Sequence, residues 1–193
     1  MCREIRQPEH PPARYSGRPL PPYRYVPGLH PHPVAHADGH SHDPSGAHPA
    51  AGPLRPPEEW RACDDYLFGA DLYNQAYWWE AHEAWEGIWQ QSDKRGPQGH
   101  FLQFLIQVAA CHLQRHMGHE DGVERLRARA FGHLDQVLAG LPAGTSYMGL
   151  DLGHFASDVR RFLDGASDAF PFLVLDLRDP PSRPPGKPSS PAA

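Results

Sequence analysis

The chain has 193 residues, of which 39% are hydrophobic, and a formal net charge of −5. This length and apolar content are enough for one domain with an ordinary core. The negative charge argues against nucleic-acid binding, because neutralising phosphates requires a basic face and none is apparent. The three cysteines share no short spacing, so the sequence predicts neither a disulfide framework nor a CxxC site.

Both ends of the chain are rich in proline. Fourteen of the 23 prolines fall within residues 1–57, and the last stretch reads DPPSRPPGKPSSPAA. Neither end has the apolar periodicity that would offset the entropy of ordering a chain. We therefore expect disordered tails over residues 1–57 and 179–193, with a folded domain over residues 58–178.

The N-terminal tail also carries a run of histidines. Six occur in LHPHPVAHADGHSHDPSGAH: His30, His32, His36, His40, His42 and His48. Neutral imidazoles are good ligands for zinc, copper or nickel, and a flexible tract can gather several around one ion. Two interpretations stay open: adventitious metal binding by a disordered tail, and a role in metal storage or delivery.

The N-terminal residues MCREIRQPEH contain no apolar signal segment. The longest apolar run, FLQFLIQVAAC, is too short and too polar to span a membrane. We expect a cytoplasmic protein without a membrane-spanning segment.

Between the tails the pattern predicts five helices. Prolines 56 and 57 and the acidic residues after them are typical of a helix start. The expected helices cover about 58–73, 76–91, 97–117, 121–139 and 151–165, and the third is the most apolar. Only FLVLDL near the end resembles a strand, and no partner for it is visible. The predicted fold class is all-α: a compact bundle of about five mostly antiparallel helices with short connections.

The second expected helix carries YWWEAHEAWEGIWQQ, which mixes bulky apolar side chains with charged ones. His82 and Glu86 stand one turn apart on a helix, and that face continues to Trp89 and back to Trp78 or Trp79. Glu83 points about 100° away by the helical repeat. The sequence therefore predicts that the His82–Glu86 pair lies within the tryptophan face.

A buried pair of this kind requires partners, because an unpaired polar group costs on the order of 1–3 kcal/mol. The next helix offers Gln103 and Gln107, which also have i,i+4 spacing. Two interpretations compete: the four residues form a structural polar network, or His82 and Glu86 ligate a divalent metal. The zinc-protease pattern HExxH has the same ligand spacing, with Glu as the base after the first His. Here the fifth position is Glu86, so the residues only mimic that pattern, with Glu83 as the suggested catalytic base and Glu86 as the alternative.

A second histidine pair, His112 and His116, has the same spacing, with His119 nearby. It falls on the opposite side of the third helix from the two glutamines. Histidines near the C-terminal end of a helix interact favourably with the helix dipole. We expect them to be surface or partly buried residues rather than a second site.

Three motifs together resemble the bacterial and archaeal DUF309 family. They are AYWWEAHEAWEGIW at 76–89, FLQFLIQVAACHLQRHMG at 101–118 and MGLDL at 148–152, preceded by Asn74. His82, Glu86 and Trp89 match the family's HxxxExxW/Y motif, and LQFLIQ matches a following LQGLIQ-like segment. The resemblance covers about residues 60–165. Phe104 stands where the family usually has a small residue, and His119 where it usually has Asn.

The resemblance implies a small all-helical domain of unestablished activity, with a motif suggested to bind metal. We therefore expect a divalent-metal site (zinc or another transition metal) or a small-ligand site on His82 and Glu86, and metal-assisted hydrolysis if the protein is an enzyme. The residues expected to line this site are Trp78, Trp89, Gln103 and Gln107. The alternative is a non-catalytic helical interaction module that binds a protein partner or a second copy of itself.

Overall fold

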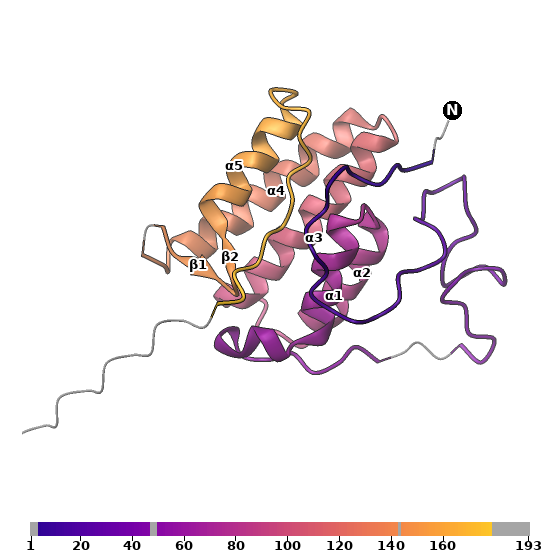
Figure 1. Cartoon of the computed structure of the whole chain (residues 1–193), viewed down its shortest axis with the longest axis horizontal. Coiled ribbons are helices and arrows are strands. Elements are labelled where there is room, and N and C mark those ends of the chain that lie inside the picture. Colours follow the sequence, from indigo (N-terminus) through magenta and orange to yellow (C-terminus); the bar gives the residue numbers. More distant parts are fainter. Residues whose placement is uncertain (1–3, 47–49, 143, 179–193) are drawn as a thin grey trace, which may run out of the picture.

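The computed structural model describes residues 4–46, 50–142 and 144–178 (Figure 1). Its elements in chain order are the 3-10 helix η1 (Pro57–Ala62), α1 (Asp64–Asn74), α2 (Trp78–Trp89), α3 (Pro97–His116), α4 (Glu120–Leu138), β1 (Ser146–Tyr147), β2 (Leu150–Asp151) and α5 (Leu152–Leu163). The prediction of a compact all-α fold is confirmed. Within the described ranges, no helix combines the length and apolar content needed to cross a bilayer.

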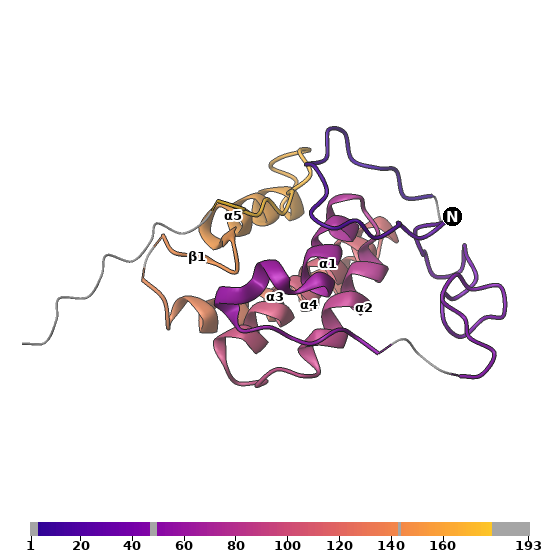
Figure 2. The same cartoon turned by 60° about the horizontal axis from the view of Figure 1, so that its bottom comes forward.

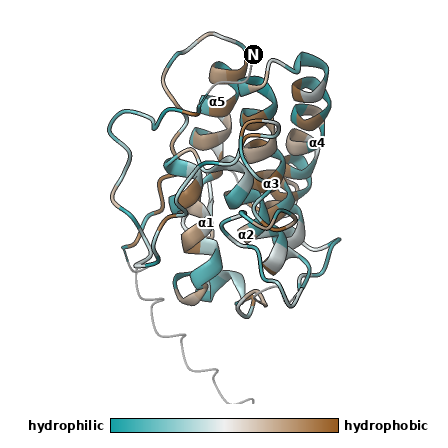
Figure 3. Ribbon diagram, turned by 90° about the vertical axis from the view of Figure 1, so that its right-hand side faces the viewer, coloured by the Kyte–Doolittle hydropathy of each residue, from teal (hydrophilic) through white to brown (hydrophobic). Residues whose placement is uncertain are grey.

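Helices α1 to α4 pack in sequence, with α3 between α2 and α4. Figure 3 shows hydrophobic residues along α3, α4 and α5. The fully buried large side chains come from all of these elements and from α1, and include Tyr66, Tyr73, Trp85, Phe101, Phe104, Leu134 and Phe155. The apolar spacing in α3 places most of its circumference in this core, as its sequence predicts.

The first expected helix is divided in two at Cys63, whose φ of −93° and ψ of 89° are not helical. The division lets Trp60 of η1 reach the β1–β2 hairpin, where it is buried against Gly149. Gly149 has a φ of +80°, and a Cβ there would overlap the Trp60 ring. A position that needs both positive φ and close approach accepts only glycine.

The β1–β2 hairpin begins in the gap between the fourth and fifth expected helices, where no strand was predicted. Its two-residue turn, Met148 and Gly149, has positive φ at both positions, as tight hairpins require. The candidate strand in FLVLDL also has a partner, since Leu175 forms an antiparallel bridge with Leu150. Each strand of the hairpin has only two residues, and the bridge pairs single residues from distant parts of the chain, so periodicity did not reveal either pairing.

The N-terminal segment differs from the expected disorder. Residues 4–46 and 50–56 run outside the helices and across α1 and α2 (Figure 2). Ile5, Tyr25 and Val26 are buried, and Asp71 of α1 accepts hydrogen bonds from the backbone N–H groups of residues 15 and 16 at 2.6 and 2.9 Å. Composition could not show this, because the segment is held by carboxylates on the helices rather than by its own apolar pattern. The C-terminal tail predicted over 179–193 lies outside the described residues.

Candidate functional site

The buried face of α2 is set by Trp85. Its side chain is fully buried, and its indole N–H donates to the carbonyl of Tyr66 at 3.2 Å. The ring lies against Gly69 of α1, where a Cβ would overlap it. His82 and Glu86 each lie one residue from the face formed by Ala81 and Trp85, so the helical repeat turns them about 100° away.

The prediction that the His82–Glu86 pair lies within the apolar face is therefore wrong. The side chains of His82 and Glu86 are 29% and 41% exposed. The apolar residues on every side of this helix left its buried face undecided, and Trp78 and Trp89 indicated the wrong one. Contact with Tyr66 and Gly69 on α1 selects the face that carries Trp85.

Glu83 joins the pair rather than pointing away from it. His82 Nδ1 lies 3.2 Å from Glu83 Oε1, and His82 Nε2 lies 3.5 Å from Glu86 Oε2. One donor atom from each of the three lies within 4.8 Å of the others, and no other trio of His, Cys, Asp or Glu in the described chain meets this criterion. We call His82, Glu83 and Glu86 the His82 cluster.

The two glutamines expected to face this cluster bond to each other instead. Gln107 Nε2 donates to Gln103 Oε1 at 3.2 Å. No hydrogen bond between described residues joins either glutamine to His82 or Glu86, and Gln107 Oε1 is buried without a partner. The structure thus forms two separate polar pairs.

Comparison with known families places this helix in a recognised context. Residues 66–126 match the model of DUF309, described as a domain of unknown function. This part of the chain is a DUF309 match. The resemblance is confirmed over a shorter range than the expected 60–165: it holds most of α1, all of α2 and α3 and the start of α4, but not MGLDL at 148–152. No curated protein matches the chain.

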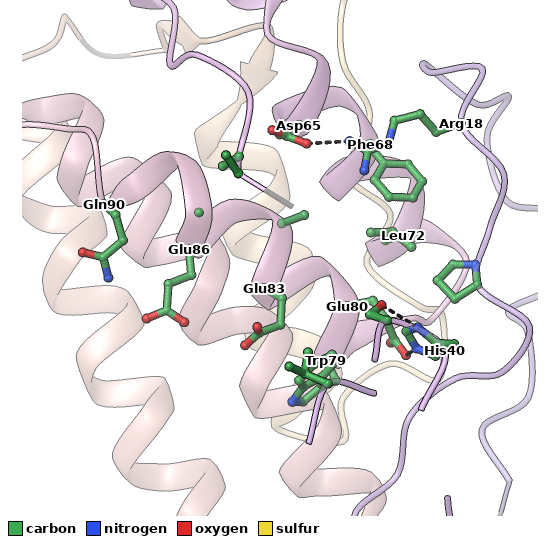
Figure 4. Close-up of a pocket in the computed structure, with 17 residues that line it drawn as sticks. Arg18, His40, Asp65, Phe68, Leu72, Trp79, Glu80, Glu83, Glu86 and Gln90 are labelled. Atoms are coloured by element: carbon green, nitrogen blue, oxygen red, sulfur yellow. Dashed lines mark hydrogen bonds and ion pairs between the residues drawn. The ribbon is translucent and has the colours of Figure 1, made fainter. Parts of the chain in front are cut away.

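Beside α2 lies a cavity of about 450 Å³, formed by α1, α2 and the N-terminal segment (Figure 4). We call it the Glu80 cavity. Its lining includes Glu80, Glu83, Glu86, Phe68, Leu72 and Trp79. Figure 4 shows the three glutamates following one another along α2. Two members of the His82 cluster therefore also border the cavity, whereas His82 does not line it.

The two tryptophans predicted to line the site on His82 and Glu86 contact other groups. The Trp78 ring packs against His112, with ring centroids 5.5 Å apart. Trp89 lies beneath Lys94, whose Nζ is 3.7 Å from the ring centroid. Neither borders the Glu80 cavity, and Trp79 provides its tryptophan wall instead.

Glu80 had no predicted role, yet it is the most deeply placed acidic group of the cavity, at 5% exposure. Its Oε1 accepts from Tyr25 N at 2.9 Å and lies 3.2 Å from His40 Nε2. Its Oε2 is buried without a hydrogen-bond partner. The only sequence signal was a carboxylate in an aromatic run, next to Trp79.

His112 corrects the expectation of a surface or partly buried histidine. It is fully buried in the DUF309 segment, with Nε2 2.9 Å from Tyr73 Oη. Tyr73 donates its own proton to the carbonyl of Pro171 at 3.0 Å, so His112 Nε2–H is the donor to Tyr73. Burial, with a smaller contribution from Arg115, lowers the pKa of His112 to about 3. His112 is therefore a neutral core residue.

Three of the described histidines of the N-terminal segment each contact a different group of the protein. His30 Nε2 lies 3.0 Å from Glu4, His40 contacts Glu80, and His42 Nδ1 lies 2.9 Å from the carbonyl of Val34. His48 lies outside the described residues. Metal binding by this segment stays a prediction.

Proposed function

We propose that the His82 cluster binds a divalent metal ion. The observation that supports this is the approach of three donor atoms to within 4.8 Å on an exposed part of α2. Imidazole nitrogen and carboxylate oxygen are ligands of zinc and related ions, at about 2.0–2.2 Å. Ligand atoms at that distance from one ion lie at most about 4.4 Å apart, so a small side-chain rotation brings these three together.

The proposed reaction class is metal-assisted hydrolysis. Three protein ligands leave a coordination position for water, as in catalytic rather than structural zinc sites, and a bound ion makes that water more acidic. Glu83 and Glu86 both belong to the cluster and also line the Glu80 cavity. The carboxylate oxygen of Glu83 that does not hold the ion, or that of Glu86, would accept a proton beside a substrate held in the cavity.

The test measures metal content in the full chain, because the N-terminal segment packs on the helices. The protein is equilibrated with zinc or manganese, passed through a desalting column and analysed for metal. His82→Ala and Glu86→Gln are each expected to lose one equivalent of ion. His36→Ala is the matched control, since His36 is an exposed histidine of the N-terminal segment that could also hold metal. Equal metal content in His82→Ala and the unaltered chain would refute the site.

The alternative function is a non-catalytic interaction module. It is supported by the contacts of His82, whose two ring nitrogens lie 3.2 and 3.5 Å from carboxylate oxygens of Glu83 and Glu86. A protonated imidazole forms two ion pairs in this geometry. If the protein stays folded and binds no metal under every loading condition, this alternative is favoured. Analytical ultracentrifugation then tests whether the partner is a second copy of the chain.

A further inference from the structure

The starting point is the unpaired oxygen of Glu80. A buried carboxylate oxygen without a hydrogen bond is costly, on the order of 1–3 kcal/mol or more for a charged group. Glu80 Oε2 is such an atom, on a side chain that is 5% exposed and lines a cavity of about 450 Å³. A hydrogen-bond donor inside the cavity would satisfy it.

The charges around the cavity favour a cation. Four carboxylates line it, from Asp65, Glu80, Glu83 and Glu86. The one arginine of the lining, Arg18, is bound to two carboxylates of α1, Asp64 and Asp65. The positive charge of Arg18 is therefore neutralised by these carboxylates, and the remaining residues that line the cavity carry a net negative charge.

The walls favour an organic cation over a bare ion. Phe68, Leu72 and Trp79 give the cavity an apolar side, on which methylene groups can pack. Trp79 also presents an aromatic ring that attracts ammonium groups. Hydrated metal ions gain nothing from such a wall, whereas an alkyl amine uses both the carboxylates and the apolar surface.

The spacing of the glutamates indicates more than one ammonium group. Positions 80, 83 and 86 rise by 1.5 Å per residue, so the first and last are separated by about 9 Å along α2. An extended chain of three or four methylenes separates two ammonium groups by roughly one helical turn, about 5.4 Å. We propose that the Glu80 cavity binds a linear aliphatic amine with two or more ammonium groups, the innermost one donating to Glu80 Oε2.

This site goes beyond the proposed metal centre and needs no ion at His82. The two proposals share Glu83 and Glu86, so a bound ion and the outer ammonium group compete for the same carboxylates. Measurements in EDTA therefore test the amine site alone, and failure there leaves the metal titration unaffected.

The experiment is calorimetric titration of the full chain, in EDTA and moderate salt, with spermidine, 1,4-diaminobutane and butylamine. We expect one spermidine per chain and an affinity that falls in that order. Glu80→Gln is expected to weaken spermidine binding tenfold to a hundredfold, about the effect of a charge-assisted hydrogen bond. Glu124→Gln is the matched control, because Glu124 is an exposed glutamate of α4 outside the cavity lining, and it is expected to change nothing.

A second variant separates ligand binding from folding. Glu80→Gln keeps a carbonyl oxygen for Tyr25 N, and its melting temperature is checked beside the titration. Ala84→Leu changes no charge but fills the cavity that Ala84 lines, and it is also expected to abolish binding. Absence of spermidine binding, equal binding by Glu80→Gln and Glu124→Gln, or butylamine binding as tightly as spermidine would each overturn the proposal.

Discussion

Four acidic residues of α1 and α2 fall into two groups with opposite surroundings. Asp71 and Glu80 are 1% and 5% exposed, and both accept hydrogen bonds from the N-terminal segment. Glu83 and Glu86 are 44% and 41% exposed and contact His82 on their own helix. All four belong to the DUF309 segment, so the difference lies in what covers them.

The comparison shows which carboxylates stabilise the folded structure. A buried carboxylate is stable where another segment supplies donors to it, and the proline-rich N-terminal segment does this with its backbone N–H groups. Exposed carboxylates keep their water and remain open to a ligand. Glu80 belongs to the buried group, but only one of its oxygens accepts from the N-terminal segment and the other, also buried, has no partner.

The largest effect is expected from Asp71→Ala. The change removes the acceptor of Tyr15 N, Ser16 N and Ser16 Oγ, and also an ion pair with Arg14 at 3.5 Å. Hydrogen bonds to charged groups contribute about 1.5–3 kcal/mol each, so we expect the free energy of unfolding to fall by about 3–5 kcal/mol. Urea denaturation followed by tryptophan fluorescence measures it.

Asp135→Ala is the control for that variant, since Asp135 is an exposed residue of α4. Its free energy of unfolding is expected to change by no more than about 0.5 kcal/mol. If both variants lose the same small amount, Asp71 does not hold the N-terminal segment, and the division between buried and exposed carboxylates fails.

A second buried group, His112, predicts acid sensitivity. Its folded-state pKa of about 3 lies below the ordinary 6.5, so the unfolded chain binds the proton more readily. The stability contributed by neutral His112 is therefore complete above pH 6.5 and is lost as the pH falls toward 3. At pH 4.5 the loss is about 2–3 kcal/mol.

The check compares the pH dependence of unfolding in His112→Gln and in His154→Gln, whose histidine is 78% exposed. Glutamine at 112 still offers a donor to Tyr73 but does not titrate. We expect the free energy of unfolding of His112→Gln to fall less steeply below pH 6.5, while His154→Gln follows the unaltered chain. Parallel curves for all three proteins would show that His112 is not held neutral.

Local periodicity predicted the helices because each depends on residues close in sequence. The third helix, expected over 97–117, spans Pro97–His116, and the fourth, expected over 121–139, spans Glu120–Leu138. Spacing likewise predicted that His82 and Glu86 are neighbours. It could not predict the buried face of α2, because that choice is made by Gly69 and Tyr66 on another helix.

The ordered packing of the N-terminal segment was not predicted for the same reason. Its order depends on acceptors at Asp71 and Glu80, which are 55 or more residues away from their partners. The aromatic surroundings of His112 are also assembled from distant elements, including Phe162 and Phe170. Composition and spacing do not reveal contacts between distant residues. The proline content therefore indicated a disordered N-terminal segment, and the position of His112 near a helix end indicated a surface or partly buried histidine.

The smallest effect is expected where the comparison predicts no structural role. His82→Ala, measured in EDTA, removes two contacts of a half-exposed imidazole and leaves the exposed glutamates hydrated. Because exposed ion pairs contribute about 0.2–1 kcal/mol, we expect the free energy of unfolding to change by less than about 1 kcal/mol. Adding zinc is then expected to raise the melting temperature of the unaltered chain and not of the variant, since an ion that binds the folded state stabilises it. If the free energy of unfolding in EDTA fell by more than about 2 kcal/mol, His82 would instead be a residue that stabilises the fold, as Asp71 is.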